Sequence, residues 1–233
     1  ELKTKPTQHS VNELRRIGIQ PDVIICRSDQ PIPEGIRDKV SLFCDVERQA
    51  VIPLQTVSTI YEVPVMLEEA GLGQLICERL KLGDCRADLS QWEDLVRRFK
   101  APREPVHIAL VGKYVELKDA YYSVRESLQH AALHHNRDLK MTWIHAEDLE
   151  TNGNGCEALR SAQGILVPGG FGVRGIEGMI KAARYARENK VPYLGLCLGM
   201  QIMVIEFARC ILGSPEPNST EFRILRRSAT SAI

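Results

Sequence analysis

Short runs rich in apolar residues alternate with longer stretches of helical apolar spacing through the second half of the chain. The runs are bounded by Gly, Pro or polar residues, which predicts buried strands. Such alternation is typical of the α/β class, in which helices cover both faces of a parallel sheet. The predicted strands are Val106–Val111, Lys140–Ile144, Gly164–Val167 and Pro192–Leu196, with helices near 119–135, 156–162, 175–189 and 199–212.

The first part of the chain shows a weaker form of the same alternation. Pro21–Cys26 and Val40–Cys44 are predicted to be buried strands, and Ala50–Leu54 a weaker third. Ser58–Ala70 carries apolar residues near helical spacing, and Gly71 is predicted to end that helix. Both parts of the chain are therefore expected to form parallel sheets flanked by helices.

A polar segment separates these two parts, and we interpret it as an interdomain linker that permits one short helix. The expected organisation is a first domain at 1–82, the linker at 83–104, a second domain at 105–222 and an aberrant tail at 223–233.

Composition adds limits to this picture. Of the 233 residues, 44% are hydrophobic and 26% charged, as in an ordinary globular protein. Thirty basic and thirty acidic side chains cancel, so neither nucleic acid nor a membrane is an expected partner. The seven cysteines form no CxxC pair, so the sequence signals neither a zinc site nor a disulfide framework, as expected of a reduced cytoplasmic protein.

Cys197 stands at the junction of the last predicted strand and the last predicted helix. Glycines flank it as Gly195-x-Cys197-x-Gly199, the cysteine form of a nucleophile elbow. Such a turn exposes the side chain, and the following helix N-terminus favours a thiolate. The N–H of Leu198 then points to where an oxyanion would form. The alternative is a core cysteine whose flanking glycines serve packing alone.

A glycine-rich turn follows an earlier predicted strand, Gly164–Val167, through Pro168 to Gly172. Such a turn can offer a free N–H, that of Gly170, as a second oxyanion donor. An ordinary loop is the alternative for this segment alone, and a dinucleotide-binding loop fits poorly. Two such turns at adjacent strand ends, one carrying a cysteine, favour an active site.

Three segments, Val167–Gly172, Gly195–Gln201 and Asn218–Phe222, resemble the class I glutamine amidotransferase domain of CTP synthases. The resemblance implies a flavodoxin-like domain in which Cys197 attacks the side-chain amide of glutamine, giving a glutamyl thioester and ammonia. It implies an oxyanion hole from two backbone N–H groups, and a carboxylate that pairs with the ammonium group of glutamine. The residues implied in these roles are Gly170, Leu198, Gly199, Met200, Gln201 and Glu221.

Lysines, threonines and a glutamine are concentrated at the start of the chain, before a helical run. Lysines and hydroxyls at a helix entrance suit phosphate binding, and a solvated helix cap is the alternative. The hexapeptide Lys-Thr-Lys-Pro-Thr-Gln resembles the loop of CTP synthases that binds UTP as substrate and CTP as product inhibitor. The residues so implied are Lys3, Thr4, Lys5, Pro6, Thr7, Gln8 and Lys39 for UTP or CTP, and Gln55, Thr56 and Val57 for ATP.

This resemblance runs from Glu1 to about Phe222. It implies the C-terminal part of a P-loop-type amidoligase domain followed by a truncated amidotransferase domain. In that family ATP phosphorylates UTP, and ammonia from glutamine displaces the phosphate to give CTP. Mg²⁺ accompanies the ATP through ligands upstream of this chain, and GTP is an allosteric activator. No prosthetic group takes part, and the intact protein is a homotetramer.

The chain departs from the family pattern toward both ends. All six histidines precede Cys197, whereas the family's catalytic histidine and its orienting glutamate follow the cysteine. No GxxxxGK[ST] P-loop and no metal site is recognised, and the tail Arg223–Ile233 does not resemble the family. We therefore expect an inactive internal fragment with a truncated or frame-shifted end. Two alternatives stay open: another amidotransferase that shares only the elbow, and a regulatory pseudo-amidotransferase that binds without turnover.

Overall fold

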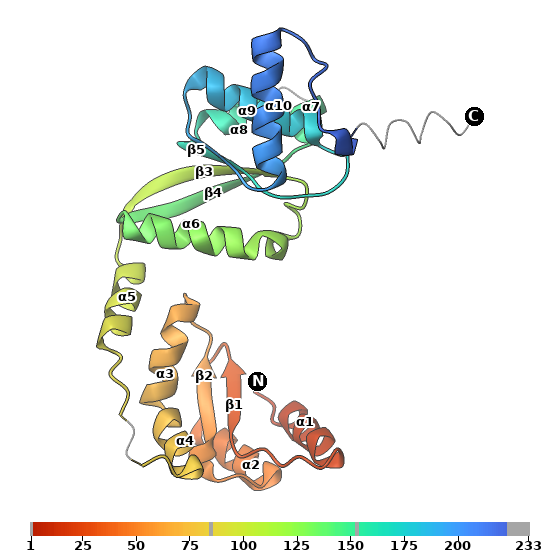
Figure 1. Cartoon of the computed structure of the whole chain (residues 1–233). Helices are drawn as coiled ribbons and strands as arrows, with labels where there is room; N and C mark the ends of the chain where they lie inside the picture. Colours follow the sequence, from red (N-terminus) through yellow and green to blue (C-terminus); the bar gives the residue numbers. More distant parts are fainter. Residues whose placement is uncertain (1, 84–85, 152–153, 223–233) are drawn as a thin grey trace, which may run out of the picture. The chain divides into compact units, whose positions relative to one another are not determined.

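The structure, a computed structural model, describes residues 2–83, 86–151 and 154–222. The chain divides into two compact units, residues 1–101 and 102–233, each with its own parallel sheet and its own core (Figure 1). The α/β class predicted from the sequence, with parallel sheets flanked by helices, is confirmed. The tail predicted as aberrant, 223–233, lies outside the described residues.

The first unit is built on two parallel strands, β1 and β2, paired from Ile24 opposite Val51 to Ser28 opposite Gln55. Its elements are α1 (Lys5–Arg16), β1 (Ile24–Ser28), α2 (Glu34–Cys44), η1 (Arg48–Ala50), β2 (Val51–Gln55), η2 (Ile60–Glu62), α3 (Val63–Glu69), α4 (Leu72–Leu80) and α5 (Ser90–Lys100). One buried cluster joins two helices to both strands through Val11, Ile24, Val40, Cys44 and Val51.

The strand predicted at Val40–Cys44 is wrong, because these residues end helix α2. Val40 and Cys44 lie four residues apart and are both buried, as one helical face requires. Between them Leu42 is 75% and Phe43 57% exposed, so the apolar run does not mark a buried strand. A short apolar run fits either structure, and packing against the sheet decided this one. The neighbouring strand predictions are confirmed by β1 and β2.

Helix α5 lies within the segment predicted as a linker. The indole Nε1 of Trp92 donates to the carbonyl oxygen of Tyr61 at 2.6 Å, and the ring of Phe99 stacks on Tyr61 at 4.6 Å between centroids. Lys100 Nζ lies 2.6 Å from a carboxylate oxygen of Glu62. These contacts attach α5 to η2, and the boundary between the compact units falls after residue 101.

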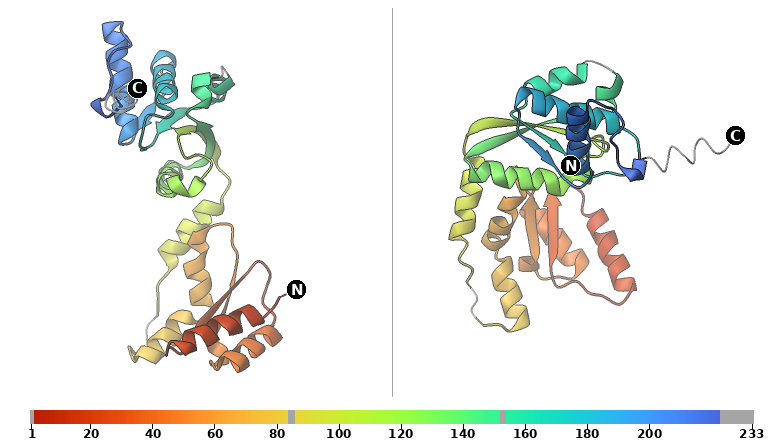
Figure 2. Two further views of the ribbon diagram at one scale, coloured as in Figure 1. Left: turned by 90° about the vertical axis from the view of Figure 1, so that its right-hand side faces the viewer. Right: turned by 45° about the horizontal axis from the view of Figure 1, so that its top comes forward.

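The second unit has three layers around a four-stranded parallel sheet in the order β4-β3-β5-β6. Helix α6 covers one face, and α7 to α10 lie on the other (Figures 1 and 2). The four strands and four helices predicted here are confirmed within a few residues. The elements are β3 (Glu104–Gly112), η3 (Lys118–Tyr121), α6 (Tyr122–His134), β4 (Arg137–His145), α7 (Asp148–Thr151), α8 (Asn154–Arg160), β5 (Gly164–Val167), α9 (Ile176–Asn189), β6 (Tyr193–Gly195) and α10 (Leu198–Leu212).

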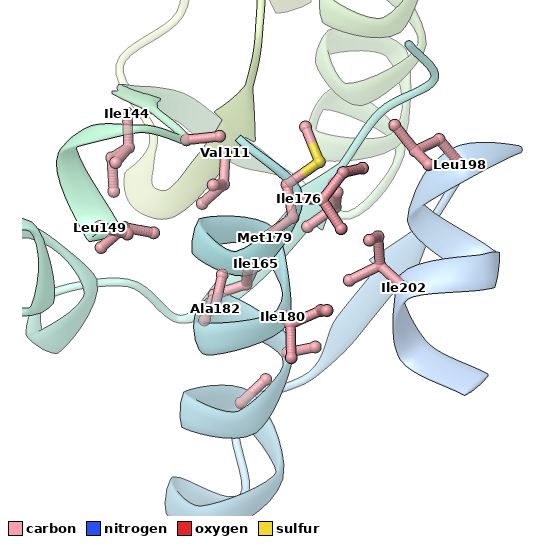
Figure 3. Close-up of a cluster of buried hydrophobic side chains, with 14 of the residues drawn as sticks. Val111, Ile144, Leu149, Ile165, Ile176, Met179, Ile180, Ala182, Leu198 and Ile202 are labelled. Carbon is pink, nitrogen blue, oxygen red and sulfur yellow. The ribbon is translucent and has the colours of Figure 1, made fainter. Parts of the chain in front are cut away.

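Alternating residues of the central strands face different cores. Ala109 and Val111 belong to the large core beneath α7 to α10, whereas Leu110 belongs to the core beneath α6. Leu198 and Ile202 of α10 are completely enclosed in the large core (Figure 3). Because a strand's side chains alternate between faces, burial on both sides requires the nearly continuous apolar runs seen in the sequence. The same packing holds the start of α10 firmly against β5.

Candidate active site

Strand order places the site at the carboxyl edge of the second sheet. Strand β4 pairs with one edge of β3, and the next strand in the chain, β5, pairs with the opposite edge of β3. In open parallel sheets, the crevice at such a reversal is the usual ligand site. Lys113 follows β3 there, the turn 168–172 follows β5, and Cys197 follows β6.

Cys197 is exposed and caps helix α10 with φ 51° and ψ −104°. A positive φ is uncommon for a residue with a Cβ, and such strain persists only where the surroundings impose it. Cys197 thus stands between the end of β6 and the first residue of α10, with its side chain exposed. The predicted elbow is therefore present as backbone geometry.

The flanking glycines let β6, α10 and β5 approach closely. A Cβ on Gly195 would lie 2.4 Å from the carbonyl carbon of Gly199, and one on Gly199 would lie 1.9 Å from the carbonyl oxygen of Val167. The N–H of Leu196 donates to that same Val167 oxygen at 2.9 Å. The hydroxyl of Tyr193 donates to the carbonyl oxygen of Gly199, also at 2.9 Å. No larger side chain fits at either glycine without moving the elbow.

The glycine turn after β5 lies against this elbow. A Cβ on Gly169 would lie 3.7 Å from the Cβ of Cys197, and one on Gly170 would lie 3.4 Å from Cδ2 of Leu198. Within the described residues, the N–H groups of Gly170 and Leu198 donate no hydrogen bond. Leu198 begins a helix, where the first N–H groups have no partner inside the helix. Two free donors beside an exposed thiol can stabilise an oxyanion.

Two residues predicted to bind glutamine, Met200 and Gln201, lie in the first turn of α10, directly after Cys197. The side-chain oxygen of Gln201 is buried and has no hydrogen-bond partner among the described residues, a costly state that a ligand would relieve. Met200 is 53% exposed. Phe222 is buried in the large core, which holds the neighbouring, exposed Glu221 on this unit. Glu221 is near enough to act electrostatically on Lys113.

Lys113 is a site residue that the sequence analysis missed. It is only 3% exposed, and its Nζ donates to the carbonyl oxygens of Phe171, at 3.0 Å, and of Gly172. Burial lowers the pKa of Lys113, and the positive charge of Arg174 lowers it further. A lysine directly after an apolar strand is the pattern that could have identified it, because strand ends carry ligand sites in this class of fold.

No histidine is hydrogen-bonded to Cys197 within the described residues. His145 instead accepts a hydrogen bond at Nδ1 from the N–H of Glu147 at 3.4 Å. The same described residues contain no group of three or more His, Cys, Asp or Glu side chains able to hold a metal ion. No helix among them is both long enough and apolar enough to cross a membrane.

The nucleotide residues predicted in the first unit lie on two of its segments. Thr4 precedes α1, and Gln8 Nε2 donates to its hydroxyl at 3.1 Å. Lys3 and Lys5 are exposed beside that helix N-terminus. Lys39 is exposed on α2, and no hydrogen bond within the described residues joins it to 2–8.

The predicted ATP residues follow β2. Thr56 Oγ1 donates to Oδ1 of Asp29 at 2.7 Å, and the N–H of Thr56 donates to the carbonyl oxygen of Ser28 at 2.9 Å. Gln55 and Thr56 thus lie at the carboxyl ends of both strands, and Val57 follows them half-buried. This edge is where α/β sheets bind ligands.

Each unit matches a known protein family. Residues 116–229 match the family described as glutamine amidotransferase class-I. The elbow and the glycine turn therefore belong to a class I glutamine amidotransferase domain. Residues 1–82 match a second family, described as the CTP synthase N-terminus.

Curated relatives share both units in the same order. A CTP synthase of Dehalococcoides mccartyi is 69% identical over 222 residues, covering 95% of this chain and 41% of the relative. One from a Roseiflexus species is 62% identical over 225 residues, covering 95% of this chain and 40% of the relative. The chain belongs to the CTP synthase family, and it spans about two-fifths of the length of these relatives. An amidotransferase that shares only the elbow is thereby excluded.

A solved structure of the glutaminase domain of Trypanosoma brucei CTPS with bound acivicin is also similar. It is 41% identical and covers 50% of this chain and 46% of that chain, with a TM-score of 0.46.

Proposed function

We propose that in the whole protein the second unit takes part in hydrolysing the side-chain amide of glutamine, with Cys197 as the nucleophile. In the whole protein, the ammonia released serves the ATP-dependent amination of UTP to CTP. The observation that carries the proposal is an exposed cysteine, held at φ 51°, beside two N–H groups that donate to nothing in the described chain. Family membership supports the choice of glutamine as substrate.

The chemistry follows from the positions of these groups. The sulfur of Cys197 attacks the amide carbon, and the carbonyl electron pair moves onto oxygen, where the N–H groups of Gly170 and Leu198 receive it. When the carbonyl re-forms, the carbon–nitrogen bond breaks and the nitrogen leaves as ammonia with the proton that the thiol gave up, giving a glutamyl thioester. Water then releases glutamate and the thiol. Gln201 and Glu221 bind the amino-acid part of glutamine, the carboxylate by pairing with its ammonium group.

Both steps need a general base, and none of the six histidines follows Cys197 in this chain. By the resemblance, that base is a histidine beyond the cysteine. We therefore propose that the 233-residue chain forms the covalent bond with a reactive glutamine analogue but does not turn glutamine over. Steady ammonia release from the purified chain would contradict this part of the proposal.

The first unit is proposed to bind nucleotides. Lys3 and Lys5 are exposed at the N-terminus of the 12-residue helix α1, where the helix dipole and free N–H groups favour phosphate. UTP or CTP binds there together with Lys39, and Gln55–Val57 border ATP. We further propose that Mg²⁺ accompanies ATP, that GTP activates glutamine hydrolysis and that the whole protein is a homotetramer. These three proposals rest on the family assignment.

Covalent labelling tests the amidase site. The chain is treated with 6-diazo-5-oxo-norleucine, an electrophile shaped like glutamine, and modified cysteines are mapped by mass spectrometry. Cys210 lies on the same helix and is also exposed, so it is the internal control. We expect labelling of Cys197 but not Cys210, and slower labelling when glutamine is present. Iodoacetamide, which carries no glutamine shape, should modify both thiols.

Equal labelling of the two cysteines by the diazo compound, or labelling that glutamine does not slow, would overturn the glutamine site. Gln201→Leu gives a second check, because it removes the unpartnered amide oxygen without touching the thiol. This variant should slow labelling by the glutamine analogue while leaving the iodoacetamide rate at Cys197 unchanged.

Calorimetric titration with CTP tests the first unit. Lys5→Met should weaken CTP binding, because it removes a positive charge beside the helix N-terminus. The matched control, Lys81→Met, removes a charge from the same unit at the end of α4 and should leave binding intact. No binding by the unaltered chain, or equal weakening in both variants, would count against the nucleotide site.

A further inference from the structure

Lys113 bridges the end of β3 to the glycine turn that follows β5. Its ammonium group donates to the carbonyl oxygens of Phe171 and Gly172, 58 and 59 residues further along the chain. Lys113 is 3% exposed, whereas the turn that carries the two acceptors is partly exposed, so these hydrogen bonds are partly buried. A buried ammonium that lost its acceptors would be strongly destabilised, so this contact holds the turn in one place.

The backbone of Lys113 is itself held from two sides. The hydroxyl of Tyr121 accepts from the N–H groups of Lys113 and Tyr114 at 3.1 and 3.2 Å. Nη2 of Arg174, which follows the glycine turn, donates to the carbonyl oxygen of Lys113 at 3.3 Å. Arg174 also pairs with Glu147, with Nε and Oε1 3.1 Å apart. The lysine therefore holds the turn, and the arginine after the turn holds the lysine.

Gly170 lies between this lysine and the elbow. A Cβ on Gly170 would lie 3.3 Å from Cδ of Lys113 and 3.4 Å from Cδ2 of Leu198. The aliphatic part of Lys113 thus packs against the residue whose N–H is one of the two free donors. A turn with this many glycines has little intrinsic preference for one conformation, so an external contact must select it.

We propose that Lys113 is a positioning residue of the amidase site, which fixes the glycine turn so that the N–H of Gly170 is available to the developing oxyanion. The inference rests on the proposed function of Cys197 and adds a residue that acts on the covalent step. When the diazo ketone 6-diazo-5-oxo-norleucine reacts, its diazo carbon takes the thiol proton and bonds to the sulfur of Cys197 as N2 leaves. Negative charge gathers on the adjacent keto oxygen in that transition state, where the oxyanion donors stabilise it. Losing their alignment therefore slows bond formation while leaving ligand affinity nearly unchanged.

Three variants test the role of this lysine. Lys113→Met keeps the aliphatic chain and removes both hydrogen bonds, while Lys113→Arg restores a cationic donor. Lys181→Met is the matched control, because Lys181 Nζ also donates to two backbone carbonyls, of Leu149 at 2.8 Å and Glu150 at 3.0 Å, away from the elbow.

Two measurements are made on the full chain. Hydrogen–deuterium exchange of peptides covering 168–174 reports the order of the turn without reference to any reaction. Labelling of Cys197 by 6-diazo-5-oxo-norleucine gives a maximal rate, kinact, and a half-saturating concentration, KI. For Lys113→Met we expect hydrogen exchange in the turn to become roughly tenfold faster and kinact to fall roughly tenfold, with KI nearly unchanged. Lys113→Arg should recover part of both losses, and Lys181→Met should change neither.

Unchanged exchange in the turn of Lys113→Met would overturn the inference, as would faster exchange with kinact unaltered. Equal effects of Lys181→Met would also overturn it, by showing a general loss of stability. If Lys113→Met does not fold, Lys113→Arg decides, since its kinact must fall without a matching change in KI. If the unaltered chain is not labelled at all, the proposed function fails, while the exchange experiment still shows whether Lys113 holds the turn.

Discussion

Replacing Gly199 with alanine places a methyl group where the structure has no room for one. The added Cβ would lie 1.9 Å from the carbonyl oxygen of Val167 and 2.8 Å from its carbonyl carbon. Carbon–oxygen contacts need about 3.3 Å, so the start of α10 must withdraw by more than about 1 Å. The neighbouring atoms are backbone, which cannot rotate away as a flexible side chain could. The perturbation therefore falls on the elbow itself.

The size of the effect follows from three opposing contributions. Overpacking of a tight contact costs about 1–3 kcal/mol. Disturbing the hydrogen bond from Leu196 to Val167 costs about 1 kcal/mol more. Alanine in place of glycine within a helix returns about 1 kcal/mol. We expect Gly199→Ala to destabilise the second unit by roughly 1–3 kcal/mol and to slow labelling of Cys197.

Urea unfolding followed by pulsed hydrogen exchange measures this for the second unit alone, because peptides from 102–222 are read separately. Gly169→Ala is the control, since its Cβ would meet the Cβ of Cys197 at an ordinary 3.7 Å. That variant should shift stability by less than about 0.5 kcal/mol. The same unfolding midpoint for both variants would refute the argument that the elbow depends on close backbone approach.

Three further predictions concern other side chains. Burial raises the pKa of Tyr193, so its contribution to stability is complete below about pH 10 and is lost as the pH rises further. Tyr193→Phe should therefore show a flatter alkaline decline in urea midpoint, and identical declines would contradict this. Glu206, 3% exposed, accepts from Arg187 Nε and Nη2 at 3.0 and 2.9 Å. Arg187→Met should thus lower the urea midpoint more than Arg187→Met combined with Glu206→Leu, and the reverse order would sink the idea. Burial also raises the pKa of Cys44. Iodoacetamide should therefore modify the exposed Cys210 in the native chain, and Cys44 only after unfolding. Modification of both cysteines at the same rate in the native chain would contradict the structure.

The elbow could be predicted because its chemistry is local. A predicted strand leads into Gly195, Cys197 and Gly199 at alternate positions within five residues, so the motif is visible in the sequence. The steric need for Gly195 arises within that turn, against Gly199, whereas Gly199 is required by its close approach to Val167 of β5. The glycine turn after β5 was equally visible from its composition. That the elbow and the glycine turn lie close together could be expected only from the general rule that the carboxyl ends of parallel strands meet at one edge of the sheet.

Helix α2 shows where local pattern was insufficient. Val40–Cys44 is apolar enough for a buried strand, yet Leu42 and Phe43 are exposed and the run is helical. Five residues are too few to separate the two periods, and the packing of α2 on α1 and the sheet supplied the missing information.

By itself the sequence determined the α/β class and the order of strands and helices in the second unit, and it predicted Cys197 as the nucleophile and the residues proposed to bind nucleotide. These follow from hydrophobic periods of a few residues and from motifs that are contiguous in the chain. Only the tertiary structure decided that Lys113 holds a turn 58 residues away, that Gln201 keeps a buried oxygen without a partner, and that Gly170 lies against Leu198. The physical reason is that contact, burial and hydrogen-bond satisfaction are properties of side chains brought together by sheet order, which no local pattern of residues contains.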